Sequence, residues 1–166
     1  LLFQKDRQKM QKFKAMTRGI LAAATVATAA TAGVANASDA GEITYRKAVM
    51  KAVGGHMGAL VGIVKGETAN KGDMVELAKG MLALAKISQH LFPKGSDAMA
   101  GETEALMKVW EDEAGFKKVN AAFVDHAPNL VTAAESGDPK ALGAAVGALG
   151  KNACKACHDG YREKKK

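Results

Sequence analysis

Aromatic residues and cysteines are both scarce in this chain, and each shortage excludes a class of structure. Only 5% of the 166 residues are aromatic and runs of β-branched residues are few, so little in the sequence favours β-strands. Alanine, leucine, methionine, lysine and glutamate are common instead, and these are strong helix formers. The two cysteines have no second pair of Cys or His ligands at motif spacing, which excludes a structural zinc site. The composition therefore predicts one all-α domain.

A strong surplus of one charge is also missing once the N-terminal segment is set aside. Residues 1–37 hold six of the 24 lysine and arginine residues and one of the 17 acidic residues, so the remainder has 18 basic and 16 acidic residues. This near-balance, without a basic stripe or interleaved aromatic residues, predicts that the protein has no nucleic-acid partner.

The N-terminal segment has the three parts of a secretory signal peptide. Lys5 to Arg18 is basic, Ile20 to Val34 is apolar and uncharged, and Ala35-Asn36-Ala37 is a small-residue cleavage site. The apolar run is shorter than the roughly 20 residues that a membrane-spanning helix needs. We therefore expect residues 1–37 to be a cleaved signal peptide and residues 38–166 to form an exported domain with no stable membrane insertion.

Apolar residues recur at helical spacing in four segments of the exported domain. We expect helices over about 40–65, from about 73 to just before Pro93, over about 112–136, and from Pro139 onward. The first has a seam with intervals of three and four residues, which is typical of helices packed in a bundle. The seam consists of Ile43, Arg46, Met50, Val53, Met57, Leu60 and Val64.

The last helical segment carries the pattern Cys154-Lys155-Ala156-Cys157-His158. C-x-x-C-H is the attachment motif of c-type haem: the cysteines form thioethers with the porphyrin vinyl groups, and the histidine offers a nitrogen to the iron. On an α-helix, Cys157 lies one turn from Cys154 and His158 lies about 40° round from it, so all three face one side. A thioredoxin-like motif would follow a strand in a βαβ unit, and no strand pattern precedes this one. We therefore predict one covalent haem c, and export agrees because this attachment takes place outside the cytoplasm.

Two seam residues of the first helix are candidates for the opposite wall of a haem pocket. Arg46 is a cation on an apolar stripe, so it is either a snorkelling arginine near a helix end or a partner for a carboxylate such as a haem propionate. We favour the propionate because a haem is already implied. Met50, one turn further on, either binds the iron through its thioether or covers the haem, although methionines in such a stripe are more often core residues.

Four amphipathic helices with C-x-x-C-H in the last of them resemble the cytochrome c′ family, the class II c-type cytochromes. The resemblance covers about residues 40–164 and rests on four sequence features. These are Tyr45-Arg46-Lys47-Ala48-Val49-Met50, Leu91-Phe92-Pro93, Gly101-Glu102-Thr103-Glu104 with Trp110, and Cys154 through Arg162. It implies an antiparallel four-helix bundle with haem bound covalently near the C-terminal helix.

The resemblance also implies a role for each matching residue. Cys154 and Cys157 would anchor the haem, and His158 would be the axial ligand. Arg46 would lie near the propionates. Lys47 departs from the family, because many members have glutamine at this position, but a lysine there could still face a propionate. Met50 would cover or bind the distal side of the iron, and Arg162 would be the basic residue of the proximal side.

For function, the resemblance leaves two hypotheses open. The first is a periplasmic monohaem cytochrome that transfers electrons to redox partner proteins, and it is not an enzyme because the predicted pocket has no catalytic acid or base. The alternative is a five-coordinate, high-spin protein that binds nitric oxide or carbon monoxide as a carrier or protective sink. Family members are often dimers through the first two helices, and Gly54, Gly58 and Gly62 form a ridge that would suit the close approach of another helix.

Overall fold

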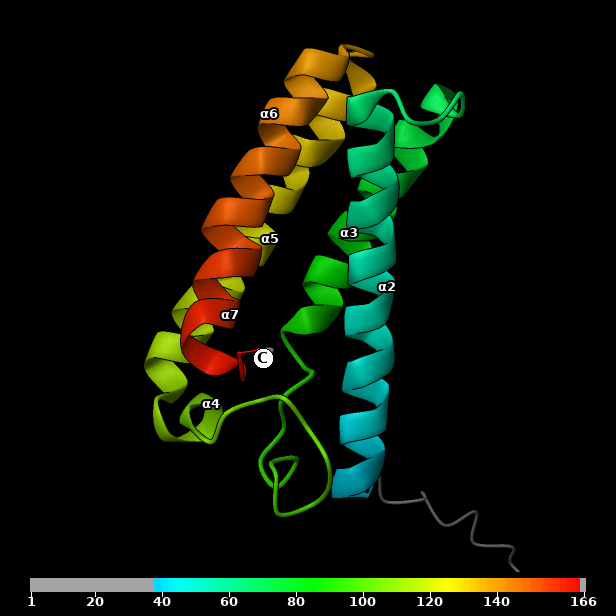
Figure 1. The fold of residues 1–166 in the computed structure, drawn as a ribbon. Coiled ribbons are helices and arrows are strands. Elements are labelled where there is room, and N and C mark those ends of the chain that lie inside the picture. The colour runs from blue at the N-terminus through cyan, green and yellow to red at the C-terminus, as the bar shows by residue number, and fades with distance from the viewer. Residues whose placement is uncertain (1–37, 165–166) are drawn as a thin grey trace, which may run out of the picture. The chain divides into compact units, whose positions relative to one another are not determined.

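The computed structural model describes residues 38–164, which form a bundle of helices (Figure 1). Four helical segments run alternately up and down. They are α2 (Asp39–Lys65), α3 (Met74–Ser88), α5 (Glu113–Glu135) and a rod made of α6 (Pro139–Leu149), η2 (Gly150–Lys155) and α7 (Ala156–Tyr161). The short elements η1 (Lys71–Asp73) and α4 (Lys108–Glu111) lie in the connections. The predicted antiparallel four-helix bundle is confirmed, whereas the predicted signal peptide lies outside the described residues.

Local sequence explains where the helices begin and end. The Ser38 hydroxyl accepts a hydrogen bond from the Gly41 amide at the start of α2, and Gly66 ends that helix with a positive φ of 73°, a backbone conformation that glycine adopts without strain. Asp138 caps α6 by accepting from the Lys140 amide, with Pro139 at the first position. These boundaries match the predictions to within a residue because each depends on contacts between near neighbours.

The end of the bundle where α2 meets α3 is filled by an apolar core to which all four long helical segments contribute. Its fully buried side chains include Leu60, Met81, Leu130, Leu142 and Leu149. The opposite end has a smaller cluster around Val109, Phe116 and Tyr161, with Phe92 and Trp110 packed against it. The space between these two clusters is available for a ligand.

A buried polar pair joins α3 to α5 beside this space. The Asn120 amide donates to the Ser88 carbonyl (3.0 Å), and the Ser88 hydroxyl lies 2.9 Å from the Asn120 side-chain oxygen. The Ser88 carbonyl is at the C-terminal end of α3 and also accepts a long hydrogen bond from the Leu91 amide (3.4 Å). Among residues 38–164, no buried side-chain nitrogen or oxygen lacks a hydrogen-bond partner.

The glycine ridge of α2 does not contact another helix of the described chain. A Cβ added at Gly54, Gly58 or Gly62 would meet nothing within 4 Å, so an approach within the bundle at these positions is excluded. The close approach occurs at Gly80 of α3, where a Cβ would lie 2.5 Å from His56 Nε2. The prediction that another helix approaches closely at Gly54, Gly58 and Gly62 is therefore wrong within the described bundle.

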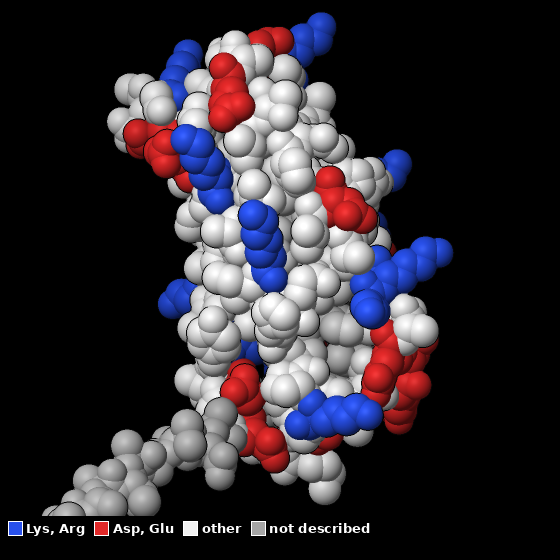
Figure 2. Space-filling model, turned by 180° about the vertical axis from the view of Figure 1, so that it is seen from behind, with Lys and Arg blue, Asp and Glu red and all other residues white. Residues whose placement is uncertain are grey.

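The surface of the bundle carries charges of both signs. Acidic and basic side chains alternate on the face seen from behind, without a continuous basic patch (Figure 2). Of the described helices, α2 has the length and composition to cross a membrane. However, Ile43, Val49, Leu60 and Ile63 of this helix are buried in the bundle, so these residues serve as core.

Candidate functional site

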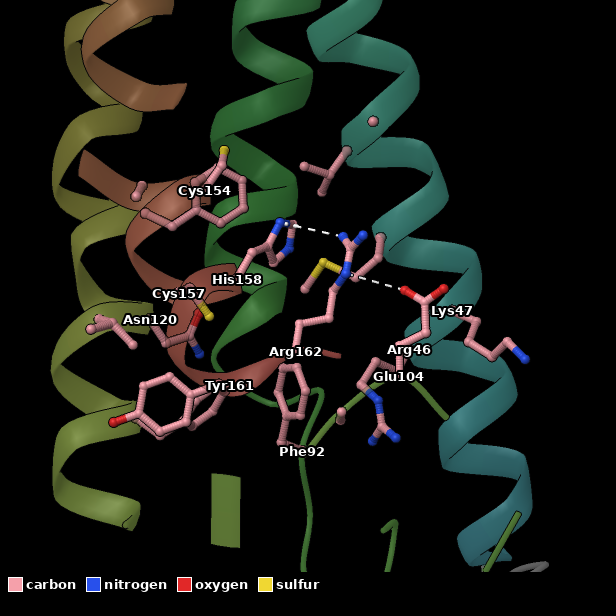
Figure 3. A pocket seen from close by; sticks show the side chains of 18 of the residues that line it. Arg46, Lys47, Phe92, Glu104, Asn120, Cys154, Cys157, His158, Tyr161 and Arg162 are labelled. Atoms are coloured by element: carbon pink, nitrogen blue, oxygen red, sulfur yellow. Dashed lines mark hydrogen bonds and ion pairs between the residues drawn. The ribbon is translucent and has the colours of Figure 1, made fainter. Parts of the chain in front are cut away.

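A cavity of about 500 Å³ lies between α2 and the η2–α7 part of the C-terminal rod. All seven residues predicted from the sequence to form the site line it, and Figure 3 labels each of them except Met50. They are Arg46, Lys47 and Met50 from α2 and Cys154, Cys157, His158 and Arg162 from the C-terminus. The remaining walls are mainly apolar, with Phe92, Phe116 and Phe123 among them.

The haem motif does not lie on a uniform α-helix as predicted. Cys154 belongs to the π-helical turn η2, whereas Cys157 and His158 belong to α7. A π-helix bonds each amide to the carbonyl five residues earlier, so it holds more residues per turn than an α-helix. The prediction that the three side chains follow α-helical angles is therefore wrong, although all three still line the cavity.

The two thiols are free and half-buried. Burial, with a smaller contribution from Cys154, raises the pKa of Cys157 to about 11. Burial also raises the pKa of Cys154. Redox-active cysteines need a lowered pKa because the thiolate is the nucleophile, so this environment does not suit a thiol oxidoreductase.

His158 and Arg162 form one side of the cavity mouth. An Arg162 Nη atom lies 3.4 Å from His158 Nδ1, and Arg162 Nε lies 3.1 Å from a Glu104 carboxylate oxygen (Figure 3). Burial and the Arg162 charge lower the pKa of His158, while Glu104 and Asp159 oppose the shift. The neutral imidazole that results is the form that binds metals.

Glu104 is a site residue that the sequence analysis named only as part of a matching segment, without a role. It lies in the connection between α3 and α5, whose backbone pairs with the end of the chain: the Glu163 amide donates to the Glu104 carbonyl (2.8 Å) and the Leu106 amide to the Tyr161 carbonyl (3.0 Å). These bonds belong to an isolated antiparallel bridge, the only extended pairing found in residues 38–164. The partner of Arg162 was not predictable because the bridge joins segments almost 60 residues apart, without a local pattern.

Arg46 is buried at 3% exposure, so its interpretation as a snorkelling arginine is wrong. Its four Nη–H donors reach the connection after α3: they bond the Leu91 carbonyl, the Ser96 hydroxyl and carbonyl, and the Thr103 hydroxyl, at 2.8–3.2 Å. The guanidinium also lies 4.9 Å from the Phe92 ring centre, and Figure 3 shows it directed toward this connection rather than toward the cysteines. Of its five donors, only the Nε–H has no partner within residues 38–164.

Lys47 and Met50 occupy different parts of the α2 wall. Lys47 is exposed, and its amine points away from Cys154, Cys157 and His158 (Figure 3). Met50 is half-buried, and Val53, Gly54 and Met57 continue the same wall. Gly54 of the glycine ridge thus faces the cavity, which the sequence analysis did not foresee.

Tyr161 ties the haem motif to the start of α5, and this contact predicts an effect of pH on stability. The Tyr161 hydroxyl donates to Asp112 (2.8 Å); this bond, and then the Gly115 amide, lower the pKa of Asp112. A carboxylate with a depressed folded pKa stabilises the fold above its unfolded pKa of about 3.9, and the stabilisation is lost as the pH falls through the folded value. In Tyr161→Phe, we therefore expect the free energy of unfolding to fall less between about pH 5 and pH 2 than in the wild type.

Urea denaturation at each pH measures this difference. Tyr45→Phe is the control because Tyr45 is an exposed tyrosine on α2, and it should follow the wild-type profile. Parallel profiles for Tyr161→Phe and the wild type would show that the hydrogen bond does not set the pKa of Asp112.

The four-helix bundle and its thiol- and imidazole-lined cavity define a c-type cytochrome. The family model for cytochrome c′ matches residues 41–162, and the chain belongs to the cytochrome c′ family. Members of this family bind one covalent haem c.

Individual relatives agree with this assignment. The chain is 33% identical over 147 residues to cytochrome c′ of Rhodospirillum rubrum, covering 89% of this chain and 99% of the relative. It is 35% identical to cytochrome c-556 of Agrobacterium tumefaciens, strain B2A, covering 76% and 100%. Among solved structures, cytochrome c′ from Rubrivivax gelatinosus is similar with a TM-score of 0.70 at 31% identity, covering 76% of this chain and 98% of that one. A nitric oxide complex of a cytochrome c prime variant from Alcaligenes xylosoxidans is similar with a TM-score of 0.69 at 30% identity, covering 77% and 98%.

Proposed function

We propose that this protein is a periplasmic monohaem electron carrier in which Cys154 and Cys157 hold haem c and His158 binds its iron. The observation that carries the proposal is the cavity, where these three side chains face Met50 across largely apolar walls. The donor set fits the group: two thiols suit thioether attachment, and a neutral imidazole suits iron. Residues 38–164 contain no cluster of three or more His, Cys, Asp or Glu side chains that could hold a metal ion by itself. Haem c supplies a one-electron iron couple when bound.

The chain's own residues would shape that chemistry in three ways. Phe92, Phe116 and Phe123 would exclude water from the cavity. Arg46 would place positive charge near the propionates, and Arg162, which lies 3.4 Å from His158, would place positive charge on the proximal side. Lys47 is exposed, and its amine would have to turn toward the cavity to meet a propionate. Glu104, a carboxylate in the cavity wall, is paired with Arg162, and His158 is assigned to the iron. The protein is therefore proposed not to be an enzyme.

Met50 decides between electron transfer and gas binding. The alternative function, a five-coordinate protein for nitric oxide or carbon monoxide, is favoured by the similarity to the cytochrome c prime whose nitric oxide complex is known. Methionine as the second axial ligand raises the reduction potential and would leave no position for a gas. For an electron carrier we expect a sharp, split α-band in the reduced protein and no change under carbon monoxide.

Variants of two cavity methionines complete this test. Met50→Ala should open the sixth position, so that the spectrum becomes high-spin and responds to carbon monoxide. Met57→Ala is the matched control, because Met57 lines the same wall and should leave the spectrum unchanged. A broad high-spin band in the wild-type protein that shifts under carbon monoxide would instead establish the gas-binding function.

The proposed export agrees with where the bundle begins. Helix α2 starts at Asp39 with Ser38 as its N-cap, so cleavage after Ala37 would leave the capping residue as the new N-terminus. Mass spectrometry of protein from the periplasm should show a chain beginning at Ser38; a chain that retains residues 1–37 would contradict the cleavage.

The proposed partners are redox proteins and a second copy of this chain. A homodimer through α2 and α3 is supported by Gly58, which is exposed and uncovered on α2, and by Tyr45, which is 52% exposed on the same helix. Analytical ultracentrifugation of the haem-loaded protein and of Gly58→Arg, a variant in the ridge, tests it. A wild type that sediments as a monomer would exclude the dimer.

A further inference from the structure

The C-terminal rod changes its helix type immediately before the haem motif. It is α-helical over Pro139–Leu149, π-helical over Gly150–Lys155 and α-helical again over Ala156–Tyr161. A π-turn of this kind corresponds to one extra residue inserted into an α-helix. Because one residue of an α-helix corresponds to about 100° of rotation, the extra residue turns everything after it by about 100° relative to a continuous α-helix.

Two buried residues show what this rotation achieves. Leu149 is 0% exposed and Tyr161 is 8% exposed, and 12 residues separate them. On a continuous α-helix their side chains would point about 120° apart, at opposite edges of the buried face. With one residue taken up by the π-turn, the angle falls to about 20° and both are buried on the same side.

The same rotation changes the directions of the Cys157 and His158 side chains. On a continuous α-helix, His158 would point about 180° from Leu149, away from the bundle, and Cys157 about 80° from it. With the π-turn, these angles become about 80° and about 20°. Cys157 and His158 line the cavity because the turn has brought them round.

We propose that the π-turn at Gly150–Lys155 is a register device that places Cys157, His158 and Tyr161 on the cavity side of the rod. The inference rests on the proposed assignment of Cys157 and His158 to haem. The first residues of the turn are not constrained by packing. A Cβ at Gly150 would meet nothing within 4 Å, and Lys151 and Asn152 are exposed. Leu149 lies before the turn and Tyr161 after it, and burying both on the same side favours the π-turn over a continuous α-helix.

The device predicts opposite outcomes for removing and adding one residue. Deletion of Lys151 removes the extra residue, so the rod becomes a continuous α-helix with Cys157, His158 and Tyr161 in their present directions. The haem-to-chain ratio and the Soret circular dichroism should then equal those of the wild type. Insertion of one alanine after Lys151 rotates the motif by about a further 100°, so the Soret circular dichroism and the cooperative thermal unfolding should be lost.

One control variant and two crystal structures complete the test. Lys151→Ala removes the same side chain without changing the length, and it should behave as the wild type. A crystal structure of the haem-loaded wild-type protein should show amides of residues 150–155 bonded five residues back, and that of the Lys151 deletion should show them bonded four residues back. A deletion as damaging as the insertion, an insertion that is tolerated, or an unbroken α-helix in the wild type would each overturn the proposal. A wild type without covalent haem would refute the proposed function instead, and the crystal structures would still report on the turn.

Discussion

Replacing both Cys154 and Cys157 with alanine is expected to abolish covalent haem attachment. These are the only cysteines of the chain, and both line the cavity beside His158, so no other sulfur can form a thioether there. The wild-type protein should retain its haem through acid–acetone extraction, and the double variant should release all of it. Intact mass spectrometry gives the same answer, because haem that is covalently attached adds its mass to the chain.

Single variants separate attachment from ligation. Cys154→Ala and Cys157→Ala should each keep one thioether, whereas His158→Ala should keep both and change the iron spectrum. His90→Ala is the matched control because His90 is exposed in the turn after α3 and does not line the cavity. Haem that stays attached in the double cysteine variant would refute the assignment of the motif.

Replacing Arg46 with methionine is expected to lower the free energy of unfolding by about 2–6 kcal/mol, because two buried carbonyl groups lose their donor. Methionine fills similar volume but donates no hydrogen bond. The Leu91 and Ser96 carbonyls would lose a buried donor, and each buried acceptor left unpaired costs about 1–3 kcal/mol. The contact of the guanidinium with Phe92 would be lost as well.

Urea denaturation of the haem-loaded protein measures this loss as a lower midpoint. Lys47→Met is the matched control, since Lys47 is the next residue on α2 and is exposed, and a surface change of this kind is usually within about 0.5 kcal/mol. If Arg46→Met were as stable as Lys47→Met, the bonds from Arg46 to the connection would contribute little. Arg46 would then act mainly on the haem, and the variant should instead show a changed reduction potential.

The role of Arg46 shows where reasoning from the sequence alone reached its limit. A cation on an apolar seam is conspicuous, and it pointed correctly to an unusual residue at the cavity wall. Its acceptors could not be predicted from the sequence because they lie on residues 45 to 57 positions away. Two of the four bonds go to backbone carbonyl groups and two go to side-chain hydroxyl groups. Every residue has a carbonyl group, so no sequence pattern marks the ones that an arginine will bind.

For the glycine ridge, the helix face was predicted correctly but the helix that packs against it was not. A spacing of four residues placed Gly54, Gly58 and Gly62 on one face of α2, and this part was correct. Which helix face packs inward is decided by the seam beside it, and that seam left the ridge uncovered within the described bundle. The close contact between α2 and α3 fell to Gly80 and His56, a pair brought together only by the way the two helices cross.

The sequence by itself determined the helices, their caps and the chemistry of the motif. Caps and turns depend on neighbours within four residues, and C-x-x-C-H carries its whole chemistry in five consecutive residues. The tertiary structure alone decided the partners of Arg46 and Arg162 and the phase of the motif. A helical pattern read from the sequence assumes about 100° per residue throughout, whereas the π-turn follows from burying Leu149 and Tyr161 on the same side of the rod.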